Sequence, residues 1–344
     1  METTHRLFAG DASALPVPAA SVHLVVTSPP YPMIAMWDGG FGAADPEIGA
    51  LLAAGRGWDA FEQMHLQLDV AWAECVRVLA PGGWIAVNIG DATRSIGPGF
   101  ALYPNHARIT MAMVRLGLSP MPDVLWRKPT NAPNKFMGSG MLPAGAYVTY
   151  EHEYIALFRK GPNRAFSAAE AERRQNSAFF WEERNRWFSD LWDALPGETQ
   201  ALKSAERTRS AAFPFEIPWR LIHMLSLQGD TVCDPFAGTG TTLAAAVACG
   251  RNSVGVDRDP ALAGRLREVM DLGMRLGPIR ARARRDTHRD FVAARLAAGK
   301  SVGHLHESGV AVTTRQERRL RLLSPESVVF EADWARVQVG EVAL

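Results

Sequence analysis

Residues 231–257 hold the feature that most limits the fold, because they read as a complete strand, turn, helix and strand. The stretch TVCDPFAG at 231–238 predicts a strand that runs into a glycine turn. TTLAAAVACG at 241–250 predicts a helix that ends at glycine, and NSVGVD at 252–257 predicts a second strand. Two strands joined through a helix normally lie parallel in one sheet. The segment therefore predicts an α/β fold built on a mostly parallel sheet.

The remainder of the chain also alternates between strand-like and helix-like segments. VHLVV at 22–26 reads as a continuous apolar strand apart from His23, which is typical of a strand that is covered on both faces. The helical spacing at 61–79 stops at Pro81-Gly82-Gly83. Further strands are expected at 5–10, 84–90, 123–128 and 151–160, and further helices at 106–118 and 215–227. Helices on both faces of the sheet follow from this alternation.

Two regions show weaker patterns. Residues 163–210 are polar and charged and carry several tryptophans, with little periodicity. Residues 263–344 begin as an arginine-rich helix and continue with segments that read either as further strands or as a small extra module. The basic cluster Arg280, Arg282, Arg284 and Arg285 fits phosphate binding or a solvated helix face equally well.

The composition is that of an ordinary globular protein. With 344 residues, 47% of them hydrophobic, and a net charge of +1, the chain has no overall field that draws it to nucleic acid, so such a surface must be local. The three cysteines lie far apart, which argues against a disulfide framework or a zinc site, and the nine histidines lack ligand spacing. No metal is expected. The chain shows neither a signal peptide nor an apolar run of the ~20 residues that span a membrane.

The turn at 234–242 suits a nucleoside-like cofactor. Gly238 and Gly240 allow the backbone to approach a ligand closely, and Asp257 follows at the distance of a ribose-binding acid. A P-loop needs a lysine that is missing here, and Leu243 replaces the third glycine of a dinucleotide motif. Asp234 would repel phosphates and favour a cation, so S-adenosylmethionine fits best. An ordinary turn with packing glycines is the alternative.

A second motif follows the strand at 22–26, where Ser28-Pro29-Pro30-Tyr31 ends it abruptly. Each proline fixes its φ angle and removes a backbone donor. The segment could dock to a partner domain as polyproline, form a structural turn, or hold a rigid site. The cofactor-like unit at 231–257 favours the rigid site.

Together, TSPPY at 27–31 and DPFAGTGTT at 234–242 resemble the motifs of the amino-group DNA methyltransferases, in the order of their β class. LAPGG at 79–83 and FPFEI at 213–217 resemble two further family motifs, so that the similarity runs from about residue 5 to 260. The resemblance implies a Rossmann-like S-adenosylmethionine-dependent methyltransferase fold that is circularly permuted. The strands that end at Asp11 and at the SPPY motif would be the third and fourth of the sheet, and those bearing Asp234 and Asp257 the first and second.

The resemblance also implies a cofactor site for S-adenosylmethionine, with S-adenosylhomocysteine as the product. Asp11 would accept from the adenine amino group, Asp234 would lie near the methionine amino group, and Asp257 would hold the ribose. Phe213 and Phe236 would flank the cofactor. The complete implied set is Asp11, Phe213, Pro214, Glu216, Asp234, Pro235, Phe236, Gly238, Gly240, Thr241, Thr242 and Asp257.

For the reaction, the resemblance implies that the Ser28 hydroxyl and the Pro29 carbonyl accept hydrogen bonds from the target amino group, while Pro30 stiffens the loop. Tyr31 would stack on a base flipped out of duplex DNA. Serine at the first position favours cytosine N4, and adenine N6 is the alternative. More remote alternatives are methylation of RNA or a protein amide, and a silent DNA-binding module. Cytosine C5 chemistry is disfavoured because no cysteine follows a proline.

DNA contacts are expected from three regions near these motifs. Trp37 lies in a glycine-rich stretch that would close over the base or merely connect elements. The loop after the strand at 123–128 presents stacking and phosphate-binding residues, or a surface loop with a core tryptophan. Residues 163–210 stand where the family has its target-recognition insert. The candidates are Trp37, Trp126, Arg127, Lys128, Arg173, Arg174, Arg184 and Arg186.

These expectations divide the chain into four parts: a catalytic half at 1–162, the insert at 163–210, a cofactor-binding half at 211–262 and an extension at 263–344. The resemblance implies a prokaryotic, cytoplasmic enzyme associated with the nucleoid, with duplex DNA as its partner and no membrane. A homodimer and a cognate restriction endonuclease are further partners that the resemblance allows.

Overall fold

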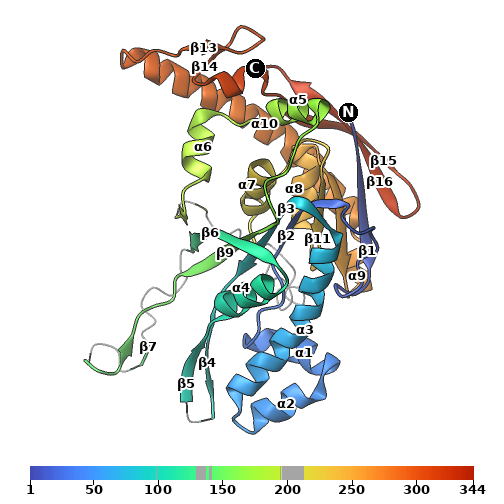
Figure 1. Ribbon diagram of the computed structural model, residues 1–344, viewed down its shortest axis with the longest axis vertical. Helices are drawn as coiled ribbons and strands as arrows, with labels where there is room; N and C mark the ends of the chain where they lie inside the picture. Colours follow the sequence, from blue (N-terminus) through green and yellow to red (C-terminus); the bar gives the residue numbers. More distant parts are fainter. Residues whose placement is uncertain (98, 129–136, 139–141, 194, 196–212) are drawn as a thin grey trace.

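The computed structural model describes residues 1–97, 99–128, 137–138, 142–193, 195 and 213–344. Within these residues one large sheet runs through the molecule (Figure 1). Its strands, in order across the sheet, are β10 (Leu191–Trp192), β6 (Leu118–Arg127), β9 (His152–Lys160), β3 (Leu79–Ile89), β2 (Val22–Thr27), β11 (Thr231–Asp234), β12 (Asn252–Asp257), β1 (Glu2–Ala9), β16 (Trp334–Val342) and β15 (Leu322–Phe330). The expected α/β class is confirmed.

The order of the central strands confirms the predicted permutation. β2, β11, β12 and β1 are neighbours in that order, and each pair is parallel. Counting from β11 as the first strand and β12 as the second, β1 and β2 are the third and fourth. β3 is parallel to β2, whereas β9 is antiparallel to β3. The carboxyl ends of β1, β12, β11, β2 and β3 therefore meet at one edge, called here the carboxyl edge, and their starts form the amino edge.

Helices cover both faces of the sheet, as expected. One face carries α1 (Asp38–Ala44), α2 (Pro46–Ala53), α3 (Gly57–Val78) and α4 (Asn105–Arg115), and the other carries α7 (Glu216–Leu225), α8 (Thr241–Cys249) and α10 (Leu266–Ala297). The largely apolar strand β2 serves both layers, because Leu24 and Val26 pack with α7 and α8 while Val25 packs with α3. Continuous apolarity is what a strand buried on both faces needs.

Several segments differ from the sequence-based expectations. The glycine-rich stretch after Tyr31 is not a plain connection, because it forms η1 (Ala35–Trp37) and α1, and its closure over the base stays a prediction. β4 (Ala92–Ile96) and β5 (Gly99–Tyr103) form a hairpin, and β7 (Met137–Gly138) pairs with β8 (Ala146–Tyr147). The region at 163–193 contains α5 (Ala168–Asn176), α6 (Trp181–Trp187) and β10. The expected asparagines at 131 and 134 and most of the stretch 194–212 lie outside the described residues.

The C-terminal extension is part of the main domain. After α9 (Pro260–Ala263), α10 packs against α8, and β16 pairs with β1 while β15 pairs with β16. β13 (His304–Leu305), β14 (Ala311–Val312) and η2 (Arg315–Arg319) lie beyond the end of α10. The sequence predicted either further strands or a small extra module for this region. The prediction of further strands is confirmed by β15 and β16. No helix in the described parts of the chain combines the length and apolar character needed to cross a membrane.

Candidate active site

The two motifs that the sequence separates by about two hundred residues meet at the carboxyl edge. Val25 of β2 lies opposite Cys233 of β11, so that TSPPY and DPFAG begin side by side. The Thr27 hydroxyl donates to Oδ1 of Asp234 at 2.7 Å. The Thr242 hydroxyl of α8 donates back to the Val26 carbonyl at 3.3 Å. The fold thus joins both motifs into one site.

Asp234 is a buried carboxylate, with only 3% of the residue exposed. Its Oδ1 also accepts from the Phe236 amide at 3.1 Å. Burial raises the pKa of Asp234 to about 6, although the hydrogen bonds from Thr27 and Thr242 oppose that rise. A buried carboxylate with a raised pKa is stabilised by a nearby cation. The sequence predicted this preference for a cation from the position of Asp234 before the glycine turn.

The glycine turn is held by the next strand. Oδ2 of Asp257 accepts from the Gly238 amide at 2.8 Å, and Oδ1 accepts from the Asp259 amide at 2.9 Å. Gly240 begins α8 with φ of 80°, and a Cβ there would lie 2.4 Å from Cγ2 of Val269. Only glycine meets both demands. Asp257 therefore lies at the turn as expected, and its ribose contact stays a prediction.

Other expected cofactor residues surround this turn. The Phe236 ring is half-buried and meets Trp72 edge-on at 5.9 Å. Phe213 and Pro214 are buried beside α7, Pro235 is buried, and Thr241 opens α8. Their contacts to the cofactor stay predictions.

Two acidic candidates already have arginine partners. Oδ2 of Asp11 accepts from Nε of Arg258 at 2.6 Å, and the bonds from Ser13 and Arg258 lower the pKa of Asp11 against the opposing effect of burial. Glu216 pairs with Arg220 and with Arg280, each at 2.7 Å. Asp11 follows β1 at the carboxyl edge of the sheet. Glu216 of α7 pairs with Arg280 of α10 and so holds the two helices together. Their contacts to the cofactor stay predictions.

The SPPY motif is organised around the Tyr31 hydroxyl. This group donates to Oε2 of Glu153 at 2.9 Å, accepts from Nδ2 of Asn88 at 2.8 Å, and lies 3.1 Å from Oγ of Ser28. Because the single phenolic proton goes to Glu153, the Ser28 hydroxyl must donate to Tyr31. The remaining lone pairs on Oγ of Ser28 are then free to accept from a ligand amino group.

Glu153, Asn88 and Lys128 form a polar network around Tyr31. Nδ2 of Asn88 also donates to Oε2 of Glu153 at 2.6 Å, and the ammonium of Lys128 pairs with Oε1 of the same carboxylate. Burial, together with the nearby Glu153 charge, raises the pKa of Tyr31 well above its ordinary value. Tyr31 therefore keeps its proton at neutral pH.

Sequence reasoning did not find Glu153 or Asn88. A signal was present, because each is a polar residue inside an otherwise apolar strand, WIAVNIG or EHEYIALF. The pairing of β3 with β9 places Asn88 opposite Ile155, and the pairing of β6 with β9 places Trp126 opposite Glu153. Lys128 follows β6 and pairs with Glu153, with its ammonium 4.8 Å from the Trp126 ring, and its expected contact with DNA stays a prediction. The network depends on this antiparallel pairing.

Behind the motif, Asn105 fixes the loop that follows Tyr31. Its Nδ2 donates to the Pro32 carbonyl at 3.1 Å and to the Gly90 carbonyl at 3.0 Å, and its Oδ1 lies 2.9 Å from Nε2 of His65. Asn105 is fully buried. The loop end is therefore anchored to β3 and α3, which limits motion at the motif.

Two of the expected DNA contacts belong to the protein core. Trp126 is 2% exposed, and its Nε1 donates to the Leu195 carbonyl at 3.4 Å. The alternative of a core tryptophan is therefore correct, and its expected stacking on DNA is wrong for this arrangement. Trp37 packs partly into the core beside α3, so that only part of its ring remains accessible. The side chain of Arg127 is 64% exposed and pairs with Glu151 at 3.3 Å.

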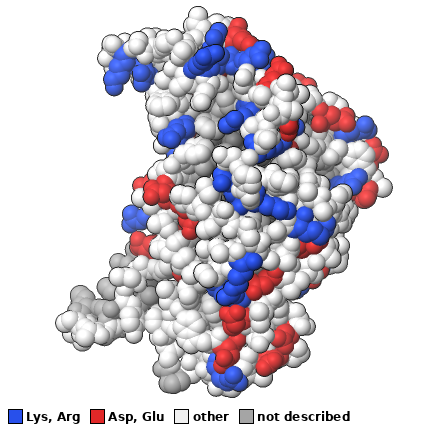
Figure 2. Space-filling model, in the orientation of Figure 1, with Lys and Arg blue, Asp and Glu red and all other residues white. Residues whose placement is uncertain are grey.

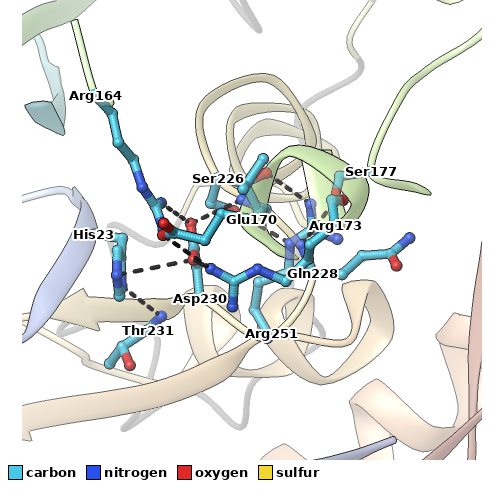
Figure 3. Close-up of polar contacts among 12 residues, drawn as sticks. His23, Arg164, Glu170, Arg173, Ser177, Ser226, Gln228, Asp230, Thr231 and Arg251 are labelled. Atoms are coloured by element: carbon cyan, nitrogen blue, oxygen red, sulfur yellow. Dashed lines mark hydrogen bonds and ion pairs between the residues drawn. The ribbon is translucent and has the colours of Figure 1, made fainter. Parts of the chain in front are cut away.

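Arg173 has a structural role at the amino edge of the sheet. It pairs at 3.1 Å with Asp230, which is fully buried just before β11, and Arg164 pairs with the same carboxylate at 2.7 Å (Figure 3). His23 faces Asp230 at 3.8 Å. Asp230 and Asp234 lie at opposite ends of one strand. The pairing with Asp230 corrects the prediction that Arg173 contacts DNA. The neighbouring Arg174 lies with its guanidinium over the Phe166 ring.

The arginines of α10 divide between protein contacts and solvent. Arg284 makes a bidentate pair with Glu183 of α6 at 2.6 and 2.8 Å, and both side chains are buried. Arg280 pairs with Glu216, and Arg285 pairs with Asp286. A fully solvated face does not describe this cluster, because Arg280 and Arg284 fasten α7 and α6, and phosphate binding by the others stays a prediction. Figure 2 shows positive side chains gathered at the end near α10, and mixed signs elsewhere on that face.

A second junction joins α6 to the extension. The ring of His288 lies 2.9 Å from Oε1 of Glu182 through Nδ1 and 3.0 Å from the Ala311 carbonyl through Nε2. Glu317 lies close enough to share a metal ion with these two residues. Its carboxylate accepts from the Trp181 amide and the Thr314 hydroxyl, at 2.9 and 2.7 Å. The group is thus a hydrogen-bonded structural junction.

Arg184 and Arg186 remain exposed on α6. Arg184 lies with its guanidinium 5.9 Å from the Phe188 ring. The buried pair of Glu183 with Arg284 fixes the helix that carries them. Their contact with DNA stays a prediction.

Known proteins resemble the chain over most of its length. The type II methyltransferase M.MthZI of Methanothermobacter thermautotrophicus is 45% identical over 95% of this chain and 92% of its own. The type II methyltransferase M.MjaI of Methanocaldococcus jannaschii is 46% identical over 76% of this chain and 89% of its own. Among solved structures, a DNA modification methylase of Thermus thermophilus complexed with S-adenosylmethionine aligns with a TM-score of 0.60 and 33% identity, covering 78% of this chain and 96% of that one.

A family model described as DNA methylase, for the N6 and N4 enzymes, matches residues 22–264. This range contains the SPPY motif, the cofactor-like turn and Glu153. Motifs, fold and relatives agree, and the chain belongs to the N6/N4 DNA methylase family, the DNA amino-methyltransferases.

Proposed function

We propose that this protein transfers a methyl group from S-adenosylmethionine to the N4 amino group of a cytosine flipped out of duplex DNA. The observation that carries the proposal is the hydroxyl of Ser28. Its proton is engaged by Tyr31 at 3.1 Å, so its lone pairs point to whatever enters the site as hydrogen-bond acceptors. Methylation of adenine N6 is the second candidate, because the same acceptor suits either amino group.

The residues present fit the cofactor. Asp234 offers a buried carboxylate to a positive group, and the turn at Gly238 and Gly240 lets the backbone approach a ligand. When bound, S-adenosylmethionine supplies an electrophilic methyl group on a sulfonium. The complex of the Thermus relative with this cofactor supports the assignment. S-adenosylhomocysteine is the expected product.

The chain's own residues then act by position. The lone pair of the target nitrogen is delocalised into the base ring, so the nitrogen is a poor nucleophile. Acceptors at Oγ of Ser28 and at the Pro29 carbonyl draw its protons out of the ring plane and turn the lone pair toward the methyl group. Pro29 and Pro30 fix the loop angles, and Asn105 anchors the loop end. The rate gain comes from orientation.

Cytosine is preferred over adenine because serine stands first in the motif, a feature more typical of the N4 enzymes in this family. The relatives named type II methyltransferases support duplex DNA as the substrate and a role beside a restriction endonuclease. Arg127, Arg184 and Arg186 are the exposed residues that we assign to phosphate contact. Weaker binding of the Arg184→Ala and Arg186→Ala variants, with a smaller salt dependence, tests this assignment.

The test of function is product analysis. The purified protein is incubated with S-adenosylmethionine and mixed-sequence duplex DNA, which is then digested to nucleosides for mass spectrometry. N4-methylcytosine supports the proposal, and N6-methyladenine overturns the choice of base. The Ser28→Ala and Tyr31→Ala variants should lose methyl transfer and still bind the cofactor. Activity that survives in both would refute the assigned site.

A further inference from the structure

We propose that Glu153 takes up the proton that the target amino group loses, through the hydroxyls of Ser28 and Tyr31. This inference rests on the proposed function. The three groups form a continuous hydrogen-bonded chain, with 3.1 Å between Ser28 and Tyr31 and 2.9 Å between Tyr31 and Oε2 of Glu153. Tyr31 and Glu153 are buried, at 7% and 9% exposure.

The chemistry requires such an acceptor. In methyl transfer the bond from carbon to sulfur breaks and a bond from carbon to the amino nitrogen forms. The nitrogen then carries a positive charge and must release one of its two protons. A neutral serine hydroxyl accepts a hydrogen bond from this group, but it is far too weak a base to keep the proton. A motif that begins with serine therefore needs a stronger base within reach.

The direction of the hydrogen bonds is correct for this transfer. The proton from the amino group passes to Oγ of Ser28, the proton of Ser28 passes to the Tyr31 oxygen, and the proton of Tyr31 passes to Oε2 of Glu153. Each hydroxyl gives one proton and receives one, so only the carboxylate ends in a new state. The raised pKa of Tyr31 means that its hydroxyl carries protons and does not itself become the base.

Neighbouring groups hold the chain in this arrangement. Asn88 donates to both the Tyr31 hydroxyl and Oε2 of Glu153, at 2.8 and 2.6 Å. Lys128 pairs with the other carboxylate oxygen, Oε1, and so leaves Oε2 to Tyr31 and Asn88. The Lys128 side chain is 42% exposed, whereas that of Glu153 is 12% exposed. A proton on Glu153 thus has a polar route to solvent beside Lys128.

Two substitutions test the relay in the full chain. Glu153→Gln keeps the size of the side chain but removes its basic oxygen, and Tyr31→Phe keeps the ring but interrupts the chain of hydroxyls. Each should lower the single-turnover rate of methylation by about a hundredfold, which is within the usual range for losing an acid–base group. Affinities for S-adenosylmethionine and DNA should stay within about twofold. The double variant should be no slower than the slower single variant, because both break one path.

A purely structural role for Glu153 predicts a different result. If the carboxylate only holds the Tyr31 ring in place, any difference between single-turnover rates in H2O and D2O should be the same in Glu153→Gln as in the wild type. A relay predicts slower transfer in D2O for the wild type, and little remaining difference in Glu153→Gln. Glu62→Gln is the matched control, because Arg108 keeps Asp69 as a partner, and its rate should be unchanged.

The outcomes separate this proposal from the proposed function. A D2O effect in Glu153→Gln as large as that of the wild type, or a Glu153→Gln rate within about threefold of the wild type, overturns the relay while the methylated product stands. N6-methyladenine as the wild-type product overturns the choice of cytosine, and the two variants still decide the relay. No methylated base from the wild type overturns both.

Discussion

Replacing Asp234 by asparagine should stabilise the protein without its cofactor while weakening cofactor binding. Burial raises the pKa of this carboxyl to about 6 from an ordinary 3.8. Each tenfold change in proton affinity corresponds to about 1.4 kcal/mol, so keeping the carboxylate ionised at neutral pH costs up to about 3 kcal/mol. The Thr27 and Phe236 bonds both end on Oδ1, which asparagine retains.

The sign of the pH dependence follows from the raised pKa. Between about pH 4 and pH 6 the folded protein holds a proton on Asp234 that the unfolded chain has released. Stability of the wild type therefore falls as the pH rises through this window, and above it the cost is complete. The Asp234→Asn variant lacks this loss. The two proteins should be close in stability near pH 4 and differ most above pH 7.

Urea unfolding of both proteins at pH 4.5 and pH 7.5, without cofactor, measures the effect. We expect Asp234→Asn to be more stable by on the order of 1 to 3 kcal/mol at the higher pH, and to bind S-adenosylmethionine at least about tenfold more weakly by calorimetry. Asp59→Asn, an exposed carboxyl beside Arg56, should change stability by less than about 1 kcal/mol. Equal stability of Asp234→Asn and the wild type at pH 7.5 would show that other interactions in the folded protein offset the cost of burying this charge, and would refute the argument.

Three further predictions concern packing and charge, and urea unfolding measures each. Gly240→Ala should cost about 2 kcal/mol or more, because its Cβ meets Val269 at 2.4 Å with φ of 80°. Arg284→Met should cost about 3 to 5 kcal/mol by leaving the carboxylate of Glu183 buried and unpaired. Hydrogen bonds to Glu182 and Ala311 raise the pKa of His288 despite burial. The stabilisation that protonated His288 provides should therefore be complete below pH 6.5 and fade as the pH rises above it, and His288→Gln should abolish this pH dependence.

Matched variants test the reasoning behind these three predictions. Gly39→Ala meets no atom within 4 Å, so a similar loss there would discredit the steric argument at Gly240. Arg282→Met lies on the same helix at an exposed position, and a cost equal to that of Arg284→Met would mean that the buried pair contributes nothing special. For His288, an unchanged pH dependence in the glutamine variant would assign that dependence to other groups.

The part of the site that rests on local motifs was predictable from the sequence. TSPPY and DPFAG each follow an apolar strand, and the carboxyl ends of parallel strands necessarily share one edge. That rule, with the family order of the motifs, predicted the neighbours β2, β11, β12 and β1. In the structure, the same edge brings Asp234 beside Thr27 and Asp257 to the glycine turn.

The roles of individual charged side chains were not predictable in the same way. Arg173 and Arg284 looked like candidates for phosphate binding, but each found a buried carboxylate, Asp230 or Glu183, on an element distant in sequence. Trp126 was expected at a surface and lies in the core. A residue type indicates what a side chain is able to bind, whereas packing decides which partner it meets.

The sequence by itself determined the α/β class, the glycine turn and the proline-stiffened loop, because each follows from a local pattern, and its resemblance to a family implied the permuted strand order. Only the tertiary structure decided what surrounds the Tyr31 hydroxyl. Glu153 and Asn88 come from strands whose antiparallel pairing and register are set by long-range packing. Their polar groups meet because burial forces each to find a partner, and no short stretch of sequence records that choice.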